Sequence, residues 1–313
     1  MAAQKKKRRR SRRKLPVTLV AVLLVCGIIA AIIAAMNGYF TDDNEKETFE
    51  KPPQVVDKSS VTMHFIDVGQ ADSILIVAPE GNMLIDAGTN SSEGDLKNYL
   101  DSLGIKKFKY AVFTHPHEDH IGGADMIMEN YEVENVILPD AVATTKTYQR
   151  MMDAIEKSKA NVIQAVPGEA FYIGALKNTI LAPVTTEGKD ANNTSVVIRT
   201  EYGETSMMFT GDAEAESEAE ILEKFDKSGL KCDLLKMGHH GSTTSSSDAF
   251  LEAVSPSIAV ISCGVDNSYG HPHAETITKL EKLKIRYYRT DLLGSIVFKS
   301  DGKQIEFVSN SGK

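Results

Sequence analysis

Seven of the eight histidines in this 313-residue chain fall into three tight clusters, each in or beside a loop. The clusters are His115, His117 and His120; His239 and His240; and His271 and His273. Scattered histidines are mostly surface or hydrogen-bonded core residues, whereas clustered histidines that follow apolar strands are typical of metal or catalytic sites. The pattern therefore indicates a metal or catalytic centre.

The first cluster has the most specific spacing, because the apolar stretch Tyr110–Thr114 leads directly into His-Pro-His-Glu-Asp-His. The proline between His115 and His117 excludes a helix here, so these two histidines lie in a tight loop and can bind one ion. Asp119 and His120 begin the next turn and can bind a second ion. Imidazole and carboxylate ligands suit Zn²⁺, with Mn²⁺ as the second choice. This run predicts a centre for two divalent cations.

This spacing after an apolar strand resembles the metallo-β-lactamase fold, and further motifs resemble the hydrolase domain of the ComEC/Rec2 competence proteins. The motifs are FIDVGQADS (65–73), LIDAG (84–88), NNTS (192–195), TGD (210–212) and GHHGS (238–242). The resemblance runs from about Val61 to His273 and implies a stand-alone metal-dependent hydrolase domain. It also implies that Asp212 bridges the two cations. The alternative for Asp212 is an ordinary aspartate in a Gly-Asp turn.

The second and third clusters supply candidates for catalysis. His239 and His240 end an apolar strand, and adjacent side chains on an extended segment point in opposite directions. We therefore expect one of them to bind metal, with His240 favoured as the ligand and His239 as its catalytic or substrate-contacting partner. His271 can donate a proton to a leaving group or hold a phosphate oxygen, and its alternative is a surface loop histidine. Asp119 is counted among the catalytic candidates as well.

Several polar residues are candidates for supporting the ligands or the substrate. Asp86 ends an apolar strand and is expected to orient a ligating histidine. Asp67 and Asp72 are weaker candidates for the same role, and the alternative for all three is a hydrogen bond at a turn or strand end. Ser242 can support a phosphate or a hydrogen bond to a ligand.

One segment departs from the wider fold. Many members carry a histidine in a Gly-His-Thr-type segment, whereas this chain has Asn192-Asn193-Thr194 there. The ComEC-like group shares this change, which leaves the first metal with fewer nitrogen ligands. Asn193 can supply an oxygen or a substrate contact instead. Binding of two ions is therefore an expectation that rests on an incomplete ligand set.

The elements that must position these residues alternate between strand and helix patterns. Each half of the folded region contains a hairpin, at Ile74–Asp86 and at Ser195–Thr210, and continues with helix–strand alternation. This order favours an α/β fold of two sheets packed face to face with helices outside, rather than one doubly wound parallel sheet. With the resemblance, it predicts a four-layer αββα sandwich of two mixed sheets, preceded by one transmembrane helix.

The N-terminal region has its own pattern. Lys5–Lys14 contains nine basic residues, and Val17–Met36 is a run of twenty uncharged residues. A run of about 20 apolar residues matches the thickness of a bilayer, although a cleaved secretory signal is the alternative. The basic flank predicts a cytoplasmic N-terminus and a catalytic domain outside the cell. We expect a basic segment at 1–16, a membrane span at 17–36, a linker at 37–60 and the hydrolase domain at 61–313.

The substrate is the least determined property. Two adjacent cations suit hydrolysis of phosphodiesters, lactams, lactones or thioesters, and the resemblance favours a phosphodiester, with DNA as the candidate. Without the nine basic residues near the N-terminus, 26 Lys and Arg remain against 43 Asp and Glu, a net charge of −17. That charge does not favour tight DNA binding, and the densest basic positions are Lys231, Lys236 and Lys279–Arg289. The alternatives are a phosphorylcholine-esterase-like hydrolase of a surface polymer and a non-catalytic competence or assembly partner.

Overall fold

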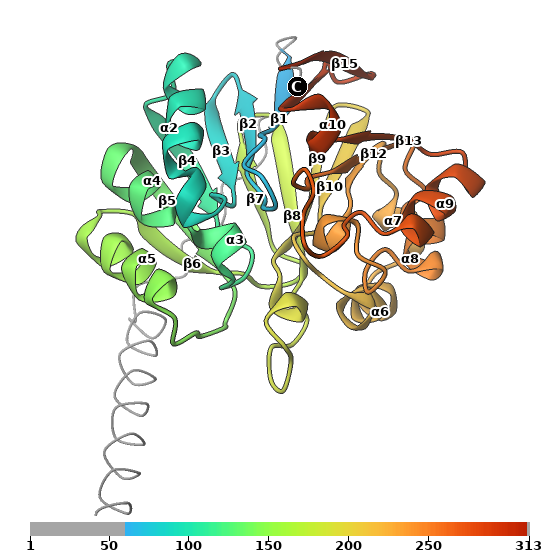
Figure 1. The fold of residues 1–313 in the computed structure, drawn as a ribbon, viewed down its shortest axis with the longest axis horizontal. Helices are drawn as coiled ribbons and strands as arrows, with labels where there is room; N and C mark the ends of the chain where they lie inside the picture. The colour runs from blue at the N-terminus through green and yellow to red at the C-terminus, as the bar shows by residue number, and fades with distance from the viewer. Residues whose placement is uncertain (1–59, 312–313) are drawn as a thin grey trace, which may run out of the picture. The chain divides into compact units, whose positions relative to one another are not determined.

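The computed structural model describes residues 60–311, which contain two β-sheets and flanking helices (Figure 1). Within this range, one sheet has eight strands and the other has seven. The first sheet has the order β15 (Ile305–Asn310), β14 (Ile296–Ser300), β1 (Val61–Phe65), β2 (Ile74–Ala78), β3 (Gly81–Ile85), β4 (Lys107–Val112), β5 (Glu132–Leu138) and β6 (Asn161–Gln164). The second has the order β13 (Arg286–Arg289), β12 (Ile258–Ile261), β11 (Leu234–Lys236), β10 (Thr205–Phe209), β9 (Val197–Tyr202), β8 (Leu176–Ala182) and β7 (Ala170–Ile173).

Both sheets are mixed, as the order of hairpins and helix–strand units predicts. In the first sheet, β1, β2 and β3 are antiparallel, and β3 through β6 are parallel. In the second, β8, β9 and β10 are antiparallel, and β10 through β13 are parallel. Parallel neighbours need a crossover connection, and the helices supply it. The predicted two-sheet α/β fold is confirmed.

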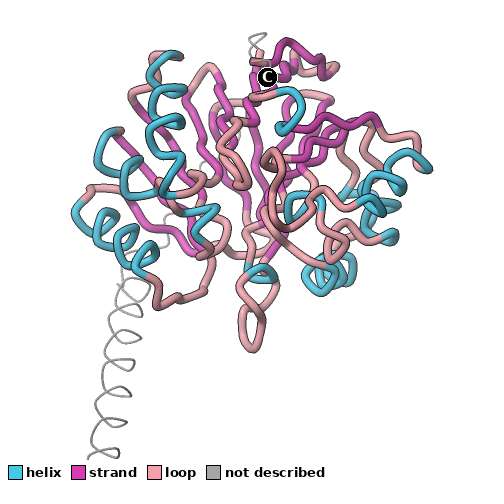
Figure 2. Tube along the Cα trace, in the orientation of Figure 1, coloured by secondary structure: helices cyan, strands magenta, loops and turns pink. Residues whose placement is uncertain are grey.

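Helices lie on the outer faces of the two sheets (Figures 1 and 2). The first sheet is accompanied by α2 (Glu93–Ser102), α3 (Glu118–Ile121), α4 (Ala124–Asn130) and α5 (Lys146–Lys157). The second is accompanied by α6 (Ala215–Lys224), α7 (Lys227–Leu230), α8 (Asp248–Val254) and α9 (Ala274–Lys282), and α10 (Thr290–Leu293) precedes β14. Three short 3₁₀ turns are η1 (Asn90–Ser92), η2 (Asn192–Thr194) and η3 (Gly238–Gly241).

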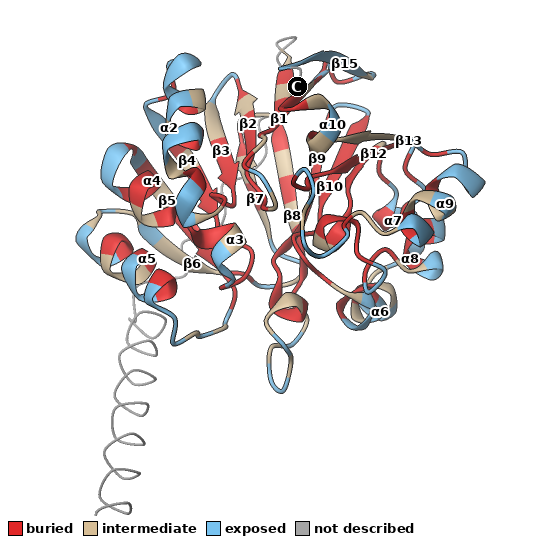
Figure 3. Cartoon of the chain, in the orientation of Figure 1, coloured by how far each residue is buried: buried red, intermediate tan, exposed pale blue. Residues whose placement is uncertain are grey.

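The space between the sheets is filled by an apolar core (Figure 3). Phe65 of β1 and Phe209 of β10 meet across the interface with ring centroids 6.3 Å apart. On the other face of the second sheet, apolar residues of α6 and α8 such as Ile221 and Phe250 pack against β11 and β12. Burial of both faces of these strands explains their nearly continuous apolar sequences.

Several features differ from the expectations or lie beyond the described residues. The strands β7 and β15 and the helices α7, α8 and α10 were not expected, and α8 begins directly after a serine-rich run.

Cys232 and Cys263 are buried free thiols. Among residues 60–311, no helix is both long and apolar enough to cross a membrane. The predicted basic segment, membrane span and nearly all of the linker fall outside the described residues.

Candidate metal centre

The candidate ligands come from loops that follow neighbouring strands of both sheets. Asp86 follows β3 directly, and His115 lies three residues after β4. In the second sheet, Asp212 follows β10 and His240 lies in η3 after β11. Because β3 and β4 are parallel, and β10 and β11 are parallel, their C-terminal ends lie at one edge of each sheet. The packing of the sheets brings these edges together.

Four of the predicted ligands form a compact group. Asp119, His120, Asp212 and His240 each offer one ligand atom, and these atoms all lie within 4.8 Å of one another. Asp212 Oδ2 lies 3.3 Å from His120 Nε2 and 3.6 Å from His240 Nε2. Asp119 Oδ2 lies 3.3 Å from His240 Nε2. The group combines two carboxylates with two imidazoles, a donor set that suits a divalent transition metal.

The electrostatics of this group also fit a bound cation. His120 Nε2 and Asp212 Oδ1 are buried and make no hydrogen bond. Burial alone would lower the pKa of His240, but Asp212 and the neighbouring carboxylates raise that pKa to about 10. Burial would likewise lower the pKa of His120, and surrounding carboxylates raise it well above its ordinary value. The group therefore attracts positive charge, and two of its atoms lack a partner that a metal ion would provide.

Acceptor oxygens face the far sides of both imidazoles in this group. Asp86 Oδ2 lies 2.7 Å from His120 Nδ1, the position predicted for an orienting carboxylate. His240 Nδ1 lies 3.0 Å from the carbonyl oxygen of Ser262 and 3.5 Å from Asp72 Oδ1. Such partners fix the ring orientation and the tautomer of a metal-binding histidine.

Asp72 is paired with a fully buried lysine beneath the centre. Lys236 Nζ lies 2.7 Å from Asp72 Oδ2, and its side chain has no exposed surface. Burial alone would raise the pKa of Asp72, but Lys236 and His240 lower it to about 2. From the sequence, Lys236 was counted among the densest basic positions when DNA binding was considered. The structure removes Lys236 from any surface patch, because β11 lies inside the second sheet and buries this side chain.

His115 and His117 form a separate pair. His115 Nε2 lies 3.0 Å from His117 Nδ1 and 3.9 Å from Asp212 Oδ2. The far nitrogen of His115 contacts the hydroxyls of Thr114 at 3.1 Å and Ser195 at 3.3 Å. Burial lowers the pKa of His115 well below its ordinary value. The structure brings this pair beside Asp212 but does not join it to the four-ligand group.

His239 and His240 are not on an extended segment. Their φ angles are 47° and 53°, in the left-handed region, and both lie in the turn η3. Asp86 also has a positive φ, of 60°. Left-handed backbone at non-glycine residues costs about 1–3 kcal/mol each and is common at functional sites. The expected opposite orientation of the two histidines therefore rested on the wrong local structure.

The two histidines of this turn nevertheless differ in environment. His240 is buried and belongs to the four-ligand group, whereas the His239 side chain is 23% exposed. His239 Nε2 lies 3.7 Å from Asp212 Oδ2, and its Nδ1 lies 3.0 Å from Glu214 Oε1. His239 is thus at the rim of the centre, held by a carboxylate on its outer side.

His271 also reaches the centre from the loop after β12. Its ring centroid lies 5.4 Å from that of His239 and 6.2 Å from that of His240. Burial, with the neighbouring histidines, lowers the pKa of His271 to about 4. The exposed ring of Tyr269 stacks on His271, with centroids 5.6 Å apart. His271 is buried at the centre, which contrasts with the alternative of a surface loop histidine.

The remaining candidates lie farther from the ligands. Asn193 Oδ1 accepts hydrogen bonds from the backbone amides of Glu214 and Ser217, at the start of α6. Ser242 Oγ accepts hydrogen bonds from the amide and hydroxyl of Thr244. These hydrogen bonds of Asn193 and Ser242 do not involve a ligand of the four-residue group.

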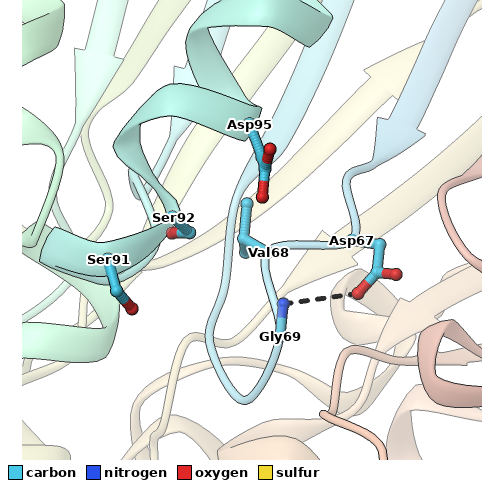
Figure 4. A pocket seen from close by; sticks show the side chains of 6 residues that line it. All are labelled: Asp67, Val68, Gly69, Ser91, Ser92 and Asp95. Atoms are coloured by element: carbon cyan, nitrogen blue, oxygen red, sulfur yellow. Dashed lines mark hydrogen bonds between the residues drawn. The ribbon is translucent and has the colours of Figure 1, made fainter.

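Asp67 lies in a different cavity. It lines a 290 Å³ pocket with Val68, Gly69, Ser91, Ser92 and Asp95 (Figure 4). Its Oδ1 accepts a hydrogen bond from the amide of Gly69, within its own loop. The lining contains none of the clustered histidines. The structure places Asp67 in the wall of this pocket and not in the four-ligand group.

Comparison with known proteins agrees with this geometry. The family described as the metallo-beta-lactamase superfamily matches residues 66–265. The chain belongs to the metallo-beta-lactamase superfamily. A solved structure of the metallo-beta-lactamase fold protein YhfI from Bacillus subtilis aligns with a TM-score of 0.54 at 12% identity, covering 77% of this chain and all of that protein. At this identity, that likeness supports the fold alone.

Among curated members of the superfamily, competence and recombination proteins are similar to this chain. ComE operon protein 3 of Bacillus subtilis is 31% identical over 252 residues, covering 75% of this chain and 32% of the relative. Recombination protein 2 of Haemophilus influenzae is 30% identical over 236 residues, covering 74% of this chain and 28% of the relative. This chain therefore spans about a third of the length of these relatives.

Three residues of this metallo-beta-lactamase centre were not singled out as site residues from the sequence. Lys236 pairs with Asp72, Glu214 holds His239, and Gln70 contacts His271. Glu214 lies two residues after Asp212, and Gln70 lies inside a motif that was recognised, so proximity to motifs was a usable signal for both. Nothing in the sequence around Lys236 distinguishes it from a surface lysine.

Proposed function

We propose that this chain is a metal-dependent phosphodiesterase that acts on DNA. The observation that carries the proposal is the four-ligand group of two carboxylates and two imidazoles, with His115 and His117 beside it. The similarity to proteins named for competence and recombination, two processes that handle DNA, supports a nucleic acid as substrate.

In this proposal, Asp119, His120, Asp212 and His240 hold one divalent ion, for which Zn²⁺ or Mn²⁺ is suitable. His115 and His117 hold a second ion, with Asp212 between the two. Bound ions of this kind supply Lewis-acid charge to a phosphoryl oxygen and make water more acidic. The list of direct ligands is therefore His115, His117, Asp119, His120, Asp212 and His240.

The rim residues act on the substrate. His239, which Glu214 holds on its outer side, and His271 offer N–H groups to phosphate or leaving-group oxygens. Asp119 is the most exposed ligand of the four-residue group, with 32% of its side chain accessible, and can accept a proton from the attacking water. Tyr269 presents an exposed ring beside His271 on which a base can stack.

The proposal also places the hydrolase domain outside the cell, anchored by the N-terminal region. A basic N-terminal segment and the span 17–36 would hold the domain at the outer face of the cell membrane. Fractionation of cells that express the chain tests this point. The intact chain is expected in the membrane fraction. Protease added outside the cells is expected to degrade it. A shortened soluble product would show that the span is cleaved.

The activity is tested with the purified full chain and Zn²⁺ or Mn²⁺. The substrates are single-stranded DNA, double-stranded DNA, bis-p-nitrophenyl phosphate and p-nitrophenylphosphocholine. Turnover of DNA and of the bis-ester is expected, and the Asp119→Ala/His120→Ala variant, purified identically, controls for contaminating nucleases. Absence of turnover on every phosphodiester would refute the proposal and favour a non-catalytic partner.

The alternative substrate, a phosphocholine ester, is supported by two observations. The chain beyond its basic segment carries a net charge of −17, and an exposed tyrosine lies beside the centre. A quaternary ammonium group is attracted to an aromatic ring through cation–π contact. Turnover of p-nitrophenylphosphocholine far above that of DNA would select this alternative.

A further inference from the structure

A glutamine from the first sheet contacts the histidine loop of the second sheet. Gln70 lies in the loop between β1 and β2, and His271 lies in the loop after β12. Gln70 Nε2 lies 3.3 Å from His271 Nδ1, and Gln70 Oε1 accepts a hydrogen bond of 2.9 Å from the amide of Gly264. A Cβ atom at Gly264 would lie 2.7 Å from the backbone nitrogen of Gln70. Glycine is therefore required for this close approach.

The two contacts of Gln70 determine which ring nitrogen of His271 carries a proton. The amide of Gly264 can only donate, so the oxygen of the Gln70 side chain must face it. The NH₂ group then faces His271 and donates to Nδ1, which must be unprotonated. The proton of the neutral ring consequently lies on Nε2, at the opposite side of the imidazole.

Other contacts keep the ring and its backbone in place. Asn267 Oδ1 accepts a hydrogen bond of 2.9 Å from the His271 amide, and Asn267 Nδ2 donates to the carbonyl of Gly264. The ring packs against those of His239 and His240, and the residue as a whole is 8% exposed. Rotation of the ring by 180° would replace Nδ1 with the Cδ2–H group, which cannot accept a hydrogen bond from the Gln70 NH₂ group, so Gln70 also disfavours the flipped orientation.

We propose that Gln70 is a positioning residue that holds His271 as the Nε2–H tautomer, so that this ring donates a hydrogen bond to a substrate oxygen at the metal centre. The proposal rests on the proposed function, because it assigns the donor for phosphodiester hydrolysis. The competing interpretation is that Gln70 only ties two loops together. The two interpretations predict opposite orders for two substitutions.

Gln70→Glu keeps the acceptor for the Gly264 amide but replaces the donor to His271 with an acceptor. The carboxylate would draw the proton of the neutral ring to Nδ1 and leave Nε2 without a hydrogen. Gln70→Met removes both hydrogen bonds but imposes no tautomer. If Gln70 sets the tautomer, the Glu variant is the more damaged in activity. If Gln70 is only a structural tie, the Met variant is the more damaged.

The tautomer is read directly by ¹⁵N NMR of the full chain, labelled with ¹⁵N-histidine, loaded with Zn²⁺ and measured at pH 9. A His271→Asn variant identifies the signals of His271. The wild-type chain is expected to show protonated Nε2 and unprotonated Nδ1, and Gln70→Glu is expected to exchange the two. Protonated Nδ1 in the wild type, or an unchanged tautomer in Gln70→Glu, would overturn the proposal.

Kinetics on bis-p-nitrophenyl phosphate, at the same pH, supply the second readout. Gln70→Glu is expected to lower kcat roughly 10- to 100-fold, as for loss of a partner that orients a site histidine. Gln70→Met is expected to change kcat by only about twofold to threefold. In the His271→Asn background, Gln70→Glu should cause no further loss, because Gln70 acts through His271. A larger loss in the Met variant contradicts the proposal.

The two readouts separate this inference from the proposed function. Suppose that no phosphodiester is turned over but the NMR shows the expected tautomers. The proposed function then fails, and the role of His271 as a hydrogen-bond donor to substrate fails with it. The assignment of Gln70 as the residue that sets the tautomer stands. If phosphodiesters are turned over but His271 carries its proton on Nδ1, the inference about Gln70 fails alone. Thermal unfolding of each variant identifies any loss that comes from misfolding.

Discussion

The two parts of the metal centre differ in how their histidines are held. In the four-ligand group, His120 is backed by the Asp86 carboxylate, and His240 is backed by a carbonyl and by Asp72. His115, in contrast, is backed only by hydroxyl groups and contacts His117 directly. A carboxylate partner raises the basicity of a metal-binding imidazole and fixes its orientation. We therefore expect one metal position to be strong and the other weak.

The histidine that many members of the wider fold carry, and that this chain lacks, would also have belonged to the weak position. Asn193 occupies its place in the sequence, and its side-chain oxygen accepts hydrogen bonds at the start of α6. That oxygen is engaged with the backbone. The weak position thus lacks both a third nitrogen ligand and a charged partner for the two that it has.

The largest effect is expected from the strong position. Asp119→Ala/His120→Ala removes two of four clustered ligands and should abolish stoichiometric metal binding. The bound metal is expected to stabilise the transition state by several kcal/mol, so its loss corresponds to a fall in kcat/KM of at least about 10³-fold. Metal analysis and kinetics on the bis-ester measure both effects, with the exposed Glu223→Ala as a matched surface control. Unchanged metal content would refute the ligand assignment.

The second expected effect concerns the pair beneath His240. Lys236→Met leaves Asp72 as an uncompensated buried charge and should destabilise the fold by about 3–5 kcal/mol. The double variant Lys236→Met/Asp72→Leu should recover most of this loss, because an apolar pair of similar volume is often neutral. Denaturant unfolding measures both variants. Equal stability of the single and double variants would show that the ion pair is not the cause.

The same pair has a defined pH dependence. The pKa of Asp72 is about 2 in the folded chain and 3.8 ordinarily. Because the folded-state value is the lower one, the contribution to stability is complete above about pH 4 and is lost as the pH falls through 2. The wild-type chain should therefore lose more stability between pH 4 and pH 2 than the double variant does.

A smaller effect is expected from the weak position. His115→Ala/His117→Ala should leave the four-ligand group intact and retain one tightly bound ion. A kcat loss of roughly 10²-fold is expected, comparable to removal of one contact that stabilises the transition state. Isothermal titration with Zn²⁺ should change from two events of different affinity to one. Loss of both events would show that the two positions are not independent.

The smallest effect is expected at the rim. Tyr269→Ala should raise KM for single-stranded DNA roughly fivefold, near the low end of the range for one stacked base. Tyr269→Phe keeps the ring and should behave as the wild type, and neither variant should alter turnover of the bis-ester. A uniform loss on every substrate would indicate disturbance of His271 rather than lost stacking.

The sequence was sufficient for features that depend on local spacing. The run from His115 to His120 and the hairpin patterns are local, and they indicated two members of the four-ligand group and the two-sheet order. The inclusion of Asp212 rested on the family resemblance. The position of Asp86 behind His120 was expected from its place at the end of an apolar strand, and Asp86 also accepts hydrogen bonds from the amide and hydroxyl of Thr114.

The failures involve contacts between segments that are distant in sequence. Lys236 is buried because β11 pairs with β10 and β12, and Asp72, its partner, comes from the other sheet. Gln70 reaches His271 across about two hundred residues. The orientation of His239 and His240 required left-handed backbone angles that residue type does not indicate. Each of these features depends on tertiary packing rather than on periodicity.

The origin of the four clustered ligands has a consequence for folding. Asp119 and His120 lie in α3, after β4 of the first sheet, and Asp212 and His240 lie in segments that follow β10 and β11 of the second. An ion held by all four residues would cross-link the segments that follow the two sheets. This cross-link could form only after the two sheets had packed against each other. The binding free energy of the ion would then be part of the folding free energy. For this chain, metal supply would govern mechanical integrity and resistance to proteolysis as well as turnover.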